Sequence, residues 1–411
     1  MALAPKYDPL RTAHELREQM ASAKRRTGLF LGAGTSMAAK LPGLDELTKK
    51  VGARLSGSPK EDFDRIVAKL GNAANVETIL NRVRLIRELI AADGAETFDG
   101  ISNDRAKQLD VAICQAIYRE VRDIPVAEMG AHYSLASWVR HVRRDEPVEL
   151  FTTNYDLLLE SAFEARGVPF FDGFVGVVAP FFVPRSVEAD GGKLTADDAP
   201  PRSWTRLWKL HGSIGWQLRQ EPGTSNKSIV RIGSADPEPG TELVIFPSAD
   251  KFSEARRVPF ATYMDRLRKF LSSGESLLLL IGYSFGDEHI NGIITQALRA
   301  NTRAALNAFV FGPVEGAVLS LAKEYRNLSA FGFTSACIGG DHAGWVMPTR
   351  SRQPGEEWPF WDESKKEFLL GDFRAFARFL DLFGGVQFSP VISPSSPPVS
   401  GPAPTIGTPN P

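Results

Sequence analysis

Four short apolar runs, each followed at once by glycine or by a cluster of polar residues, constrain the fold more than any other feature. They cover residues 28–31, 148–153, 207–210 and 277–281. Stretches with apolar residues at helical spacing lie between them. Alternating strands and helices indicate a parallel sheet with helices on both faces. We therefore predict an α/β, Rossmann-like fold, in which ligands bind beyond the carboxyl ends of the strands.

The spacing of these runs also predicts how the chain is divided. Residues 45–145 carry mostly helical patterns, so we assign them to a helical insertion within a domain that covers residues 1–345. A C-terminal helical extension follows over residues 346–388, and its amphipathic helix, residues 372–384, has an acidic cap and a glycine stop. The last segment, residues 389–411, is rich in Pro, Ser, Gly and Thr, which predicts a disordered tail.

Composition and charge exclude several classes of function. The net charge of −1 gives no global basic field, which argues against direct nucleic-acid binding as the main task. The two cysteines, Cys114 and Cys337, support neither a disulfide framework nor a four-cysteine zinc site, and we expect no metal. The polar N-terminus does not read as a signal peptide, and the longest apolar run is too short to span a bilayer. We expect a cytoplasmic protein without a membrane segment.

The first run ends in residues 32–36, with the sequence GAGTS. Glycines let a backbone approach a phosphate closely, and the start of the next helix offers free N–H donors. The segment lacks the lysine of a triphosphate-binding loop and the third glycine of the dinucleotide fingerprint. A phosphate site and a tight structural turn explain this motif equally well.

The second run ends in residues 152–156, with the sequence TTNYD, which places an amide and a carboxylate at a strand terminus. The alternative is an Asx turn that starts the next helix, because Asn and Asp favour such turns on local grounds. That alternative explains Asp156 but not the whole set of five residues.

The third run ends in His211 and Gly212. Histidine is suited to proton transfer near neutral pH, and the neighbouring glycine leaves room for a ligand. The alternative is a structural or merely exposed histidine.

The fourth run ends in residues 282–289, with the sequence GYSFGDEH, and repeats the strand–glycine–helix pattern. Ser284 and nearby backbone amides are suited to hold a second phosphate or a ribose. Asp287 is better explained as the cap of the next helix than as a catalyst, and His289 as a structural residue within that helix.

Taken together and in this order, the four motifs resemble the sirtuin-like superfamily, in the zinc-less branch used in bacterial antiphage defence. The resemblance spans about residues 24–300. It implies an NAD site and makes Asn154 and His211 the catalytic residues. The residues that it assigns to NAD binding are Gly32, Ala33, Gly34, Ser36, Thr153, Asp156, Gly282, Ser284 and Phe285.

The chain departs from sirtuin deacetylases because it lacks the two cysteine pairs that bind their structural zinc. The resemblance therefore implies NAD as a substrate that is hydrolysed to nicotinamide and ADP-ribose, by a toxic effector that depletes NAD in abortive infection. Asn154 would hold a ribose hydroxyl or the attacking water, His211 would act as general base, and Asp156 would contact the carboxamide or stabilise the site. Two alternatives stay open: a sirtuin-type deacylase or ADP-ribosyltransferase, and a sensor that binds NAD or ADP-ribose without turnover.

The resemblance also implies partners, since an NAD hydrolase that is always active would kill its host. A HerA-type ATPase is the first expectation and a short Argonaute protein the alternative. Homo-oligomerisation fits the same picture, with residues 45–145 and 372–384 as candidate contact surfaces, unless both segments simply pack on the core. The trigger, the number of subunits and any competing cyclisation of NAD stay open.

Overall fold

The computed structural model describes residues 3–94, 96–189, 199–220, 223–224, 227–233, 235–237, 243–245 and 254–384. The predicted tail, residues 389–411, lies outside these ranges.

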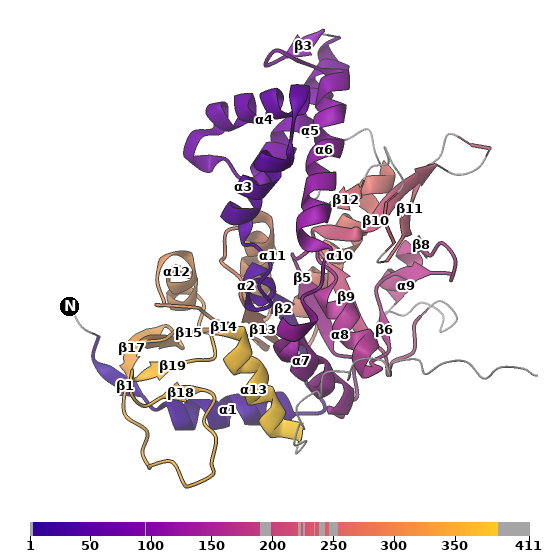
Figure 1. Ribbon diagram of the computed structural model, residues 1–411. Helices are drawn as coiled ribbons and strands as arrows, with labels where there is room; N and C mark the ends of the chain where they lie inside the picture. Colours follow the sequence, from indigo (N-terminus) through magenta and orange to yellow (C-terminus); the bar gives the residue numbers. More distant parts are fainter. Residues whose placement is uncertain are drawn as a thin grey trace, which may run out of the picture.

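A sheet of ten strands in the described residues forms the centre of the fold (Figure 1). Its order is β1-β17-β16-β15-β14-β13-β2-β5-β9-β6, and the pairs from β15 to β6 are all parallel. The α/β prediction is confirmed, because the four predicted runs are β2, β5, β9 and β13. The strands are β1 (Pro5–Tyr7), β2 (Arg26–Leu31), β5 (Glu149–Thr152), β6 (Phe170–Phe171), β9 (Thr205–Lys209), β13 (Ser276–Ile281), β14 (Ala304–Phe309), β15 (Leu328–Phe331), β16 (Ser335–Ile338) and β17 (Asp341–Trp345).

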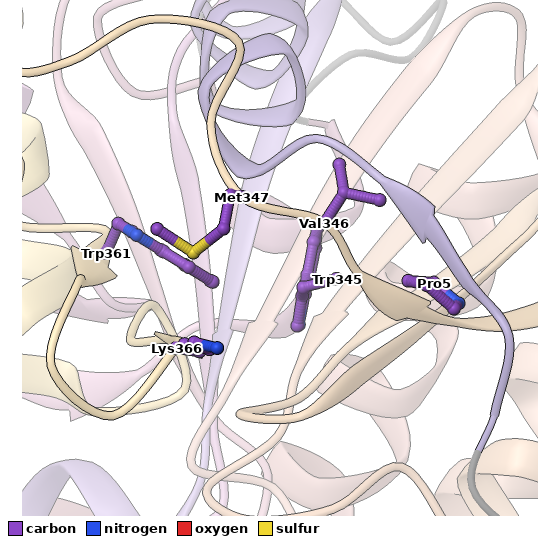
Figure 2. Close-up of a pocket in the computed structure, with 6 residues that line it drawn as sticks. All are labelled: Pro5, Trp345, Val346, Met347, Trp361 and Lys366. Carbon is purple, nitrogen blue, oxygen red and sulfur yellow. The ribbon is translucent and has the colours of Figure 1, made fainter.

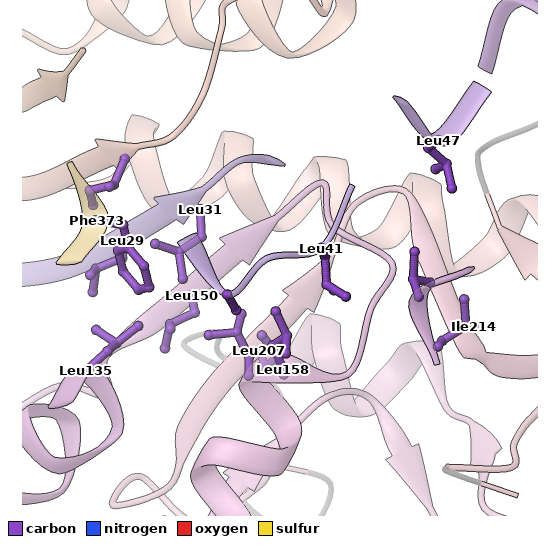
Figure 3. Packing of buried hydrophobic residues seen from close by; sticks show 14 of the residues in the cluster. Leu29, Leu31, Leu41, Leu47, Leu135, Leu150, Leu158, Leu207, Ile214 and Phe373 are labelled. Carbon is purple, nitrogen blue, oxygen red and sulfur yellow. The ribbon is translucent and has the colours of Figure 1, made fainter. Parts of the chain in front are cut away.

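Both faces of this sheet are buried, and the side chains of each strand alternate between them. On β2, Leu29 and Leu31 join one hydrophobic cluster, whereas Phe30 between them joins the other. Leu150 of β5 and Leu207 of β9 lie in the first cluster beside Leu29 and Leu31 (Figure 3). This double burial explains why the runs read as continuous apolar segments.

Helices cover the two faces as predicted. The first face carries α1 (Pro9–Ala21), α7 (Gly130–His141), α8 (Leu158–Arg166) and α13 (Phe373–Gly384). The second carries α9 (Pro184–Ala189), α10 (Glu254–Ser272), α11 (Glu288–Ala300) and α12 (Gly316–Glu324). The short α2 (Ala33–Ala38) follows β2 directly. None of the helices in the described residues is long and apolar enough to cross a membrane.

Four helices form a module that projects from the carboxyl edge of the sheet (Figure 1). They are α3 (Leu44–Arg54), α4 (Gly57–Leu70), α5 (Val76–Asp93) and α6 (Asn103–Val121), with the short elements η1 (Gly71–Ala73), β3 (Thr97–Phe98) and β4 (Ile101–Ser102). We call these residues, 44–121, the helical module. A buried ion pair joins its two longest helices, since Arg84 donates to both carboxylate oxygens of Asp110 at 3.1 Å.

The apolar side of α13 is covered within the chain. Phe373, Phe376 and Leu380 are buried, and the helix packs against α7 and α2. Asp372 begins the helix by accepting the backbone N–H of Arg374 at 2.7 Å. Packing on the core therefore explains this helix. The remaining short elements are η2 (Val126–Glu128) and the hairpin of β18 (Trp361–Asp362) and β19 (Glu367–Phe368).

A second, antiparallel sheet was not anticipated from the sequence. Its order is β12-β10-β11-β8-β7, and it stands beside the helical module (Figure 1). The strands are β7 (Phe174–Val175), β8 (Phe181–Phe182), β10 (Gly212–Gln220), β11 (Lys227–Arg231) and β12 (Leu243–Ile245). Strand β10 begins immediately after His211, so this sheet adjoins the carboxyl end of β9.

Candidate active site

The chain reverses its direction across the main sheet between β2 and β13. From β2 the strand order proceeds through β5 and β9 to one side, and from β13 it proceeds through β14 and β15 to the other. Ligands of open α/β sheets bind in the crevice at such a switch point, outside the carboxyl ends of the strands. Gly32 and Gly282 directly follow β2 and β13 there.

The two glycine turns at this point interlock through their backbones. Gly32 N–H donates to Ile281 O at 2.9 Å, and Gly34 N–H donates to Gly282 O at 3.0 Å. A Cβ atom on Gly32 would lie 2.3 Å from Gly282 O, and one on Gly34 would lie 2.7 Å from Gly282 Cα. The glycines are thus required for the close approach of the turns, which gives the GAGTS segment a structural role. Ala33, between them, is exposed.

Asn154 lies at the end of β5 and holds the first turn. Its Nδ2 donates to Gly32 O at 3.0 Å, Thr35 Oγ1 at 3.0 Å and Ser36 Oγ at 2.8 Å. Because a carbonyl oxygen can only accept, the contact with Gly32 fixes which end of the amide faces the turn. Within the described residues no partner is found for the amide oxygen of Asn154, which is therefore free to accept a hydrogen bond from a ligand.

Asp156 is buried and both of its carboxylate oxygens are engaged. Oδ2 accepts from Ser36 Oγ at 2.5 Å, and Oδ1 accepts from the backbone N–H of Leu158 at 3.0 Å. The second contact is the Asx turn considered from the sequence. Asp156 therefore joins the end of β5 to α2, and Thr153 lies half-buried beside this network.

His211 is buried between two carboxylates that come from different parts of the chain. Its Nε2 lies 2.9 Å from Asp287 Oδ2, and its Nδ1 lies 3.8 Å from Glu77 Oε1. Burial alone would lower the pKa of His211, but hydrogen bonding and charge from Asp287 and Glu77 outweigh burial and raise it to about 9. The imidazole is thus protonated at neutral pH and must lose its proton before it can act as the predicted general base.

Asp287 performs two tasks at once. Its Oδ1 accepts the backbone N–H of Ile290 at 3.0 Å and caps α11, as the sequence suggested, while its Oδ2 contacts His211. Burial would raise the pKa of this carboxyl group, but hydrogen bonds from His211 and from backbone amides hold it below its usual value. The cap fixes the carboxylate, and the carboxylate fixes the orientation of the imidazole ring.

Glu77 was missed by the sequence analysis. It belongs to the first turn of α5, whose N-cap Asn75 accepts the backbone N–H of Glu77 at 3.0 Å. A glutamate at such a position is explained by the helix dipole alone, so no local signal points to His211. Only the packing of the helical module beside β9 brings the two side chains together.

Gly212 corrects one expectation. The sequence analysis supposed that this glycine leaves room for a ligand beside His211. Its φ is +80°, and a Cβ atom there would lie 2.1 Å from Val244 O of β12. The Cβ position of Gly212 is thus filled by the neighbouring strand, and this glycine is explained by the packing of β12 against it.

The turn after β13 combines one exposed and one buried residue. Ser284 is exposed, whereas Phe285 is buried in the core with a φ of +58°. Asn291 holds the turn by donating to Phe285 O at 2.7 Å and accepting from Tyr283 Oη at 2.9 Å. The side chain of Phe285 therefore supports the turn, and Ser284 is the group that faces solvent.

A second buried histidine, His132, lies close enough to Asp156 to feel its charge, and it differs from His211 in its protonation state. His132 of α7 packs edge-on against Phe373 of α13, with ring centroids 5.0 Å apart. Burial lowers the pKa of His132 to about 4, although the charge of Asp156 opposes the shift. His132 is therefore neutral at pH 7 while His211 is charged.

These two histidines predict a maximum of folding stability near pH 6.5. Because the pKa of His211 is raised, its contribution is complete below about pH 6.5 and is lost as pH rises through about 9. Because the pKa of His132 is lowered, stability is lost as pH falls from about 6.5 towards 4. Each loss is about 3 kcal/mol at most.

Thermal midpoints measured from pH 4 to pH 10 test this expectation. The alkaline decline should shrink in His211→Asn and the acid decline in His132→Asn. Identical pH profiles for wild type and His211→Asn would contradict the charged state assigned to His211.

Neither of two hollows in the described part of the chain coincides with the strand-end cluster. One of about 260 Å³ lies at the far edge of the sheet, near β1, β17 and β18, and is lined by Pro5, Trp345, Val346, Met347, Trp361 and Lys366 (Figure 2). The other, of about 580 Å³, lies between α13 and the segment that contains β18. Among the described residues no group of three or more His, Cys, Asp or Glu side chains is placed to hold a metal ion.

Residues 148–331 match a protein-family model described as a SIR2-like domain. The matched region runs from just before β5 to the end of β15, so it contains Asn154, His211 and Ser284 but not the turn at Gly32. The match supports the sirtuin-like resemblance of this region. None of the curated proteins compared with the chain matches it.

Solved structures with similarity to the chain are Sir2 homologues. One is described as a Sir2 homolog–NAD complex, with 14% identity, a TM-score of 0.38, and coverage of 80% of this chain and 90% of that chain. Another is a mutant Sir2 homologue in complex with ADP-ribose, with 14% identity, a TM-score of 0.35, and coverage of 73% and 86%. Similarity at this level identifies no corresponding residues.

Proposed function

We propose that this chain binds NAD at the carboxyl ends of β2, β5, β9 and β13 and hydrolyses it to nicotinamide and ADP-ribose. The observation that carries the proposal is the gathering of Asn154, Ser36, Asp156 and His211 at one edge of the sheet, beside its switch point. The match of residues 148–331 to a SIR2-like domain supports NAD as the ligand.

In this proposal different polar groups of the site bind the phosphates and the ribose of NAD. The phosphates lie against the two turns, with Ser284 as the exposed group of the second turn and Ala33 as that of the first, because the N–H groups of Gly32 and Gly34 are already bound to Ile281 O and Gly282 O. Thr153, half-buried at the end of β5, is proposed to contact the ribose. The free amide oxygen of Asn154 accepts a hydrogen bond from a ribose hydroxyl or from the attacking water, because Nδ2 is committed to the first turn. Asp156 keeps Ser36 in place.

The proposed chemistry needs no acid for the leaving group. The bond between the ribose carbon and the cationic ring nitrogen breaks, and its electron pair goes to that nitrogen, which leaves as neutral nicotinamide. Water then adds to the ribose carbon and loses a proton to His211 in its neutral form. The carboxylates of Glu77 and Asp287 flank His211, so the group of three carries a net charge of −1 when His211 is protonated. That charge suits the cationic nicotinamide ring of NAD.

The wider biological role is part of the same proposal. An NAD hydrolase of this kind would act in the cytoplasm as a toxic effector of antiphage defence, assembled as a homo-oligomer and controlled by a separate protein, a HerA-type ATPase or a short Argonaute. An ADP-ribosyltransferase or deacylase would instead deliver the ribosyl group to a protein or an acyl group. A sensor would bind NAD without releasing nicotinamide.

Chromatographic measurement of nicotinamide release tests the proposal. The purified full chain is incubated with NAD alone and with the HerA-type ATPase added, and NAD binding is followed in parallel by calorimetry. Hydrolysis predicts release in at least one of these conditions. Tight binding of NAD without any release in both would favour the sensor.

An exposed aromatic pair at the same edge predicts where the adenine lies. Phe311, just beyond β14, packs against Phe333, just beyond β15, with centroids 5.1 Å apart, and 71% of the Phe311 surface is exposed. Stacking of a base on such a ring contributes about 1–3 kcal/mol. Phe311→Ala should therefore raise the KM for NAD by about 5- to 150-fold at nearly constant kcat. An unchanged KM would remove Phe311 from the binding site.

A further inference from the structure

The two carboxylates that contact His211 come from different parts of the fold: Asp287 from the main sheet and Glu77 from the helical module. Asp287 caps α11 beside the main sheet, so its position is fixed by the sheet. Glu77 belongs to the helical module, which the chain enters after α2 and leaves before α7. The side chain of His211 is 5% exposed and that of Glu77 is 26% exposed, so Glu77 is the more accessible of the two.

The position of Glu77 depends on the helical module as a unit. The N-cap Asn75 holds the first turn of α5, and Val76 N–H donates to Thr48 Oγ1 of α3 at 2.9 Å. Toward the second sheet, Arg84 Nη2 donates to Ile245 O at 3.2 Å. A displacement of the module relative to the sheet therefore moves Glu77 but leaves Asp287 in place.

The charge of Glu77 opposes the task proposed for His211. With a pKa of about 9, only about one His211 in a hundred is neutral at pH 7 and able to take a proton from water. Asp287 orients the ring and also caps α11, so it stays beside His211 and its contribution to the raised pKa is fixed. Glu77 performs no comparable task at the edge of the sheet, so its contribution to the raised pKa can change when the helical module moves.

We propose that Glu77 restrains the reaction centre by tying His211 to the helical module, and that withdrawal of α5 switches the centre on. This inference rests on the proposed NAD hydrolysis. Glu77 is a positioning residue that acts through His211. The regulated element is then the contact between α5 and the histidine, and a partner protein that moves the helical module would act as the trigger.

Two ionisable groups at the ends of β9 and β5, Lys209 and Asp156, have partners of their own. Lys209 of β9 donates to Glu160 Oε1 at 2.9 Å and to the backbone oxygen of Asp156. Tyr155 is half-buried, and burial raises its pKa well above the ordinary value, so it stays neutral. The carboxylate of Asp156 accepts from Ser36. Among the described residues, Glu77 is the carboxylate of the helical module that lies within 4 Å of His211, so a change at Glu77 removes the charge that the module contributes.

Three variants test the proposal, with the full chain used throughout. Glu77→Gln keeps the shape and removes the charge, whereas Glu77→Asp keeps the charge. Glu46→Gln is a matched control, because Glu46 is an exposed carboxylate of the same module that pairs with Lys50 at 2.9 Å. The titration of His211 is followed by NMR of histidine-labelled protein, in which its signal among the six histidines is identified by its absence in His211→Asn.

If the proposal is correct, the pKa of His211 and the rate of nicotinamide release change together. Glu77→Gln should lower the midpoint of the His211 titration by about one pH unit or more and raise nicotinamide release at pH 7 by about threefold per unit. The gain is smaller than the tenfold rise in neutral imidazole because a weaker base reacts more slowly. The pH–rate profile should shift to lower pH by the same amount as the titration, while Glu77→Asp and Glu46→Gln should resemble wild type.

Two results would overturn the proposal: an unchanged His211 midpoint in Glu77→Gln, or a rate at pH 7 that falls in this variant. If no form of the protein released nicotinamide, the proposed hydrolysis would fail and the switch with it. The NMR titration would then still show whether Glu77 is coupled to His211.

Discussion

His211→Asn should reduce nicotinamide release from NAD by about 10²–10⁴-fold, the usual range for the loss of a general base. Asparagine fills part of the space between Asp287 and Glu77 but cannot accept a proton from water. The distances of 2.9 Å and 3.8 Å place the imidazole between these two carboxylates, so the variant removes the proposed base and leaves Asp287 and Glu77 in the site. The measurement is the initial rate of nicotinamide release at several pH values.

The control for this variant must separate catalysis from folding. At pH 9 much of the ionic contribution of His211 to stability is already lost in the wild type, so the two proteins should have similar thermal midpoints there. A rate loss at pH 9 with an unchanged midpoint is then catalytic. Wild-type rates in His211→Asn would show that another group, or solvent alone, accepts the proton.

Gly212→Ala should destabilise the fold by about 2–5 kcal/mol, the combined cost of a left-handed backbone and of overpacking against a rigid neighbour. The φ of +80° disfavours any side chain, and the new methyl group would stand 2.1 Å from Val244 O. That oxygen belongs to the backbone of β12, which cannot rotate away as a flexible side chain could. The second sheet should be displaced, and His211 with it. Thermal denaturation and NAD turnover measure the two effects.

Gly274→Ala is the matched control for this prediction. Gly274 has a φ of +65°, but its Cβ position is open, with no atom within 4 Å. It should lose only about 1–2 kcal/mol, the cost of the left-handed conformation itself. If Gly212→Ala lost no more stability than Gly274→Ala, the close packing of β12 against Gly212 would be contradicted.

The strands that carry the site were predictable because their environment is uniform. β2, β5, β9 and β13 are buried on both faces, and a doubly buried strand produces an apolar run that ends where the chain reaches solvent. The polar residues that follow such runs are then placed at one edge of the sheet by the parallel pairing. Asn154, His211 and the two glycine turns were identified in this way.

The contacts between distant segments were not predictable, because local pattern contains no information about them. Glu77 reads as an ordinary glutamate of a helix N-terminus, and only the packing of the helical module brings it to His211. The sequence left open whether the glycines after β2 serve a phosphate or a tight turn, and it could not show that Gly32 and Gly282 approach each other or that Gly212 packs against β12. In the second sheet, β7, β8 and β12 are too short to produce an alternating pattern, and the nine-residue β10 is buried along most of its length, so it does not alternate either.

The most direct test of the central claim is a mass balance of the products formed from NAD by the active protein. NAD labelled in both the nicotinamide and the adenine is incubated with wild type, His211→Asn and Asn154→Ala, and free and protein-bound labels are counted. Hydrolysis at this site predicts equal amounts of free nicotinamide and free ADP-ribose from wild type, and strongly reduced amounts of both from the two variants. Adenine label bound to protein or to an acyl group, or equal turnover by all three proteins, would contradict the account.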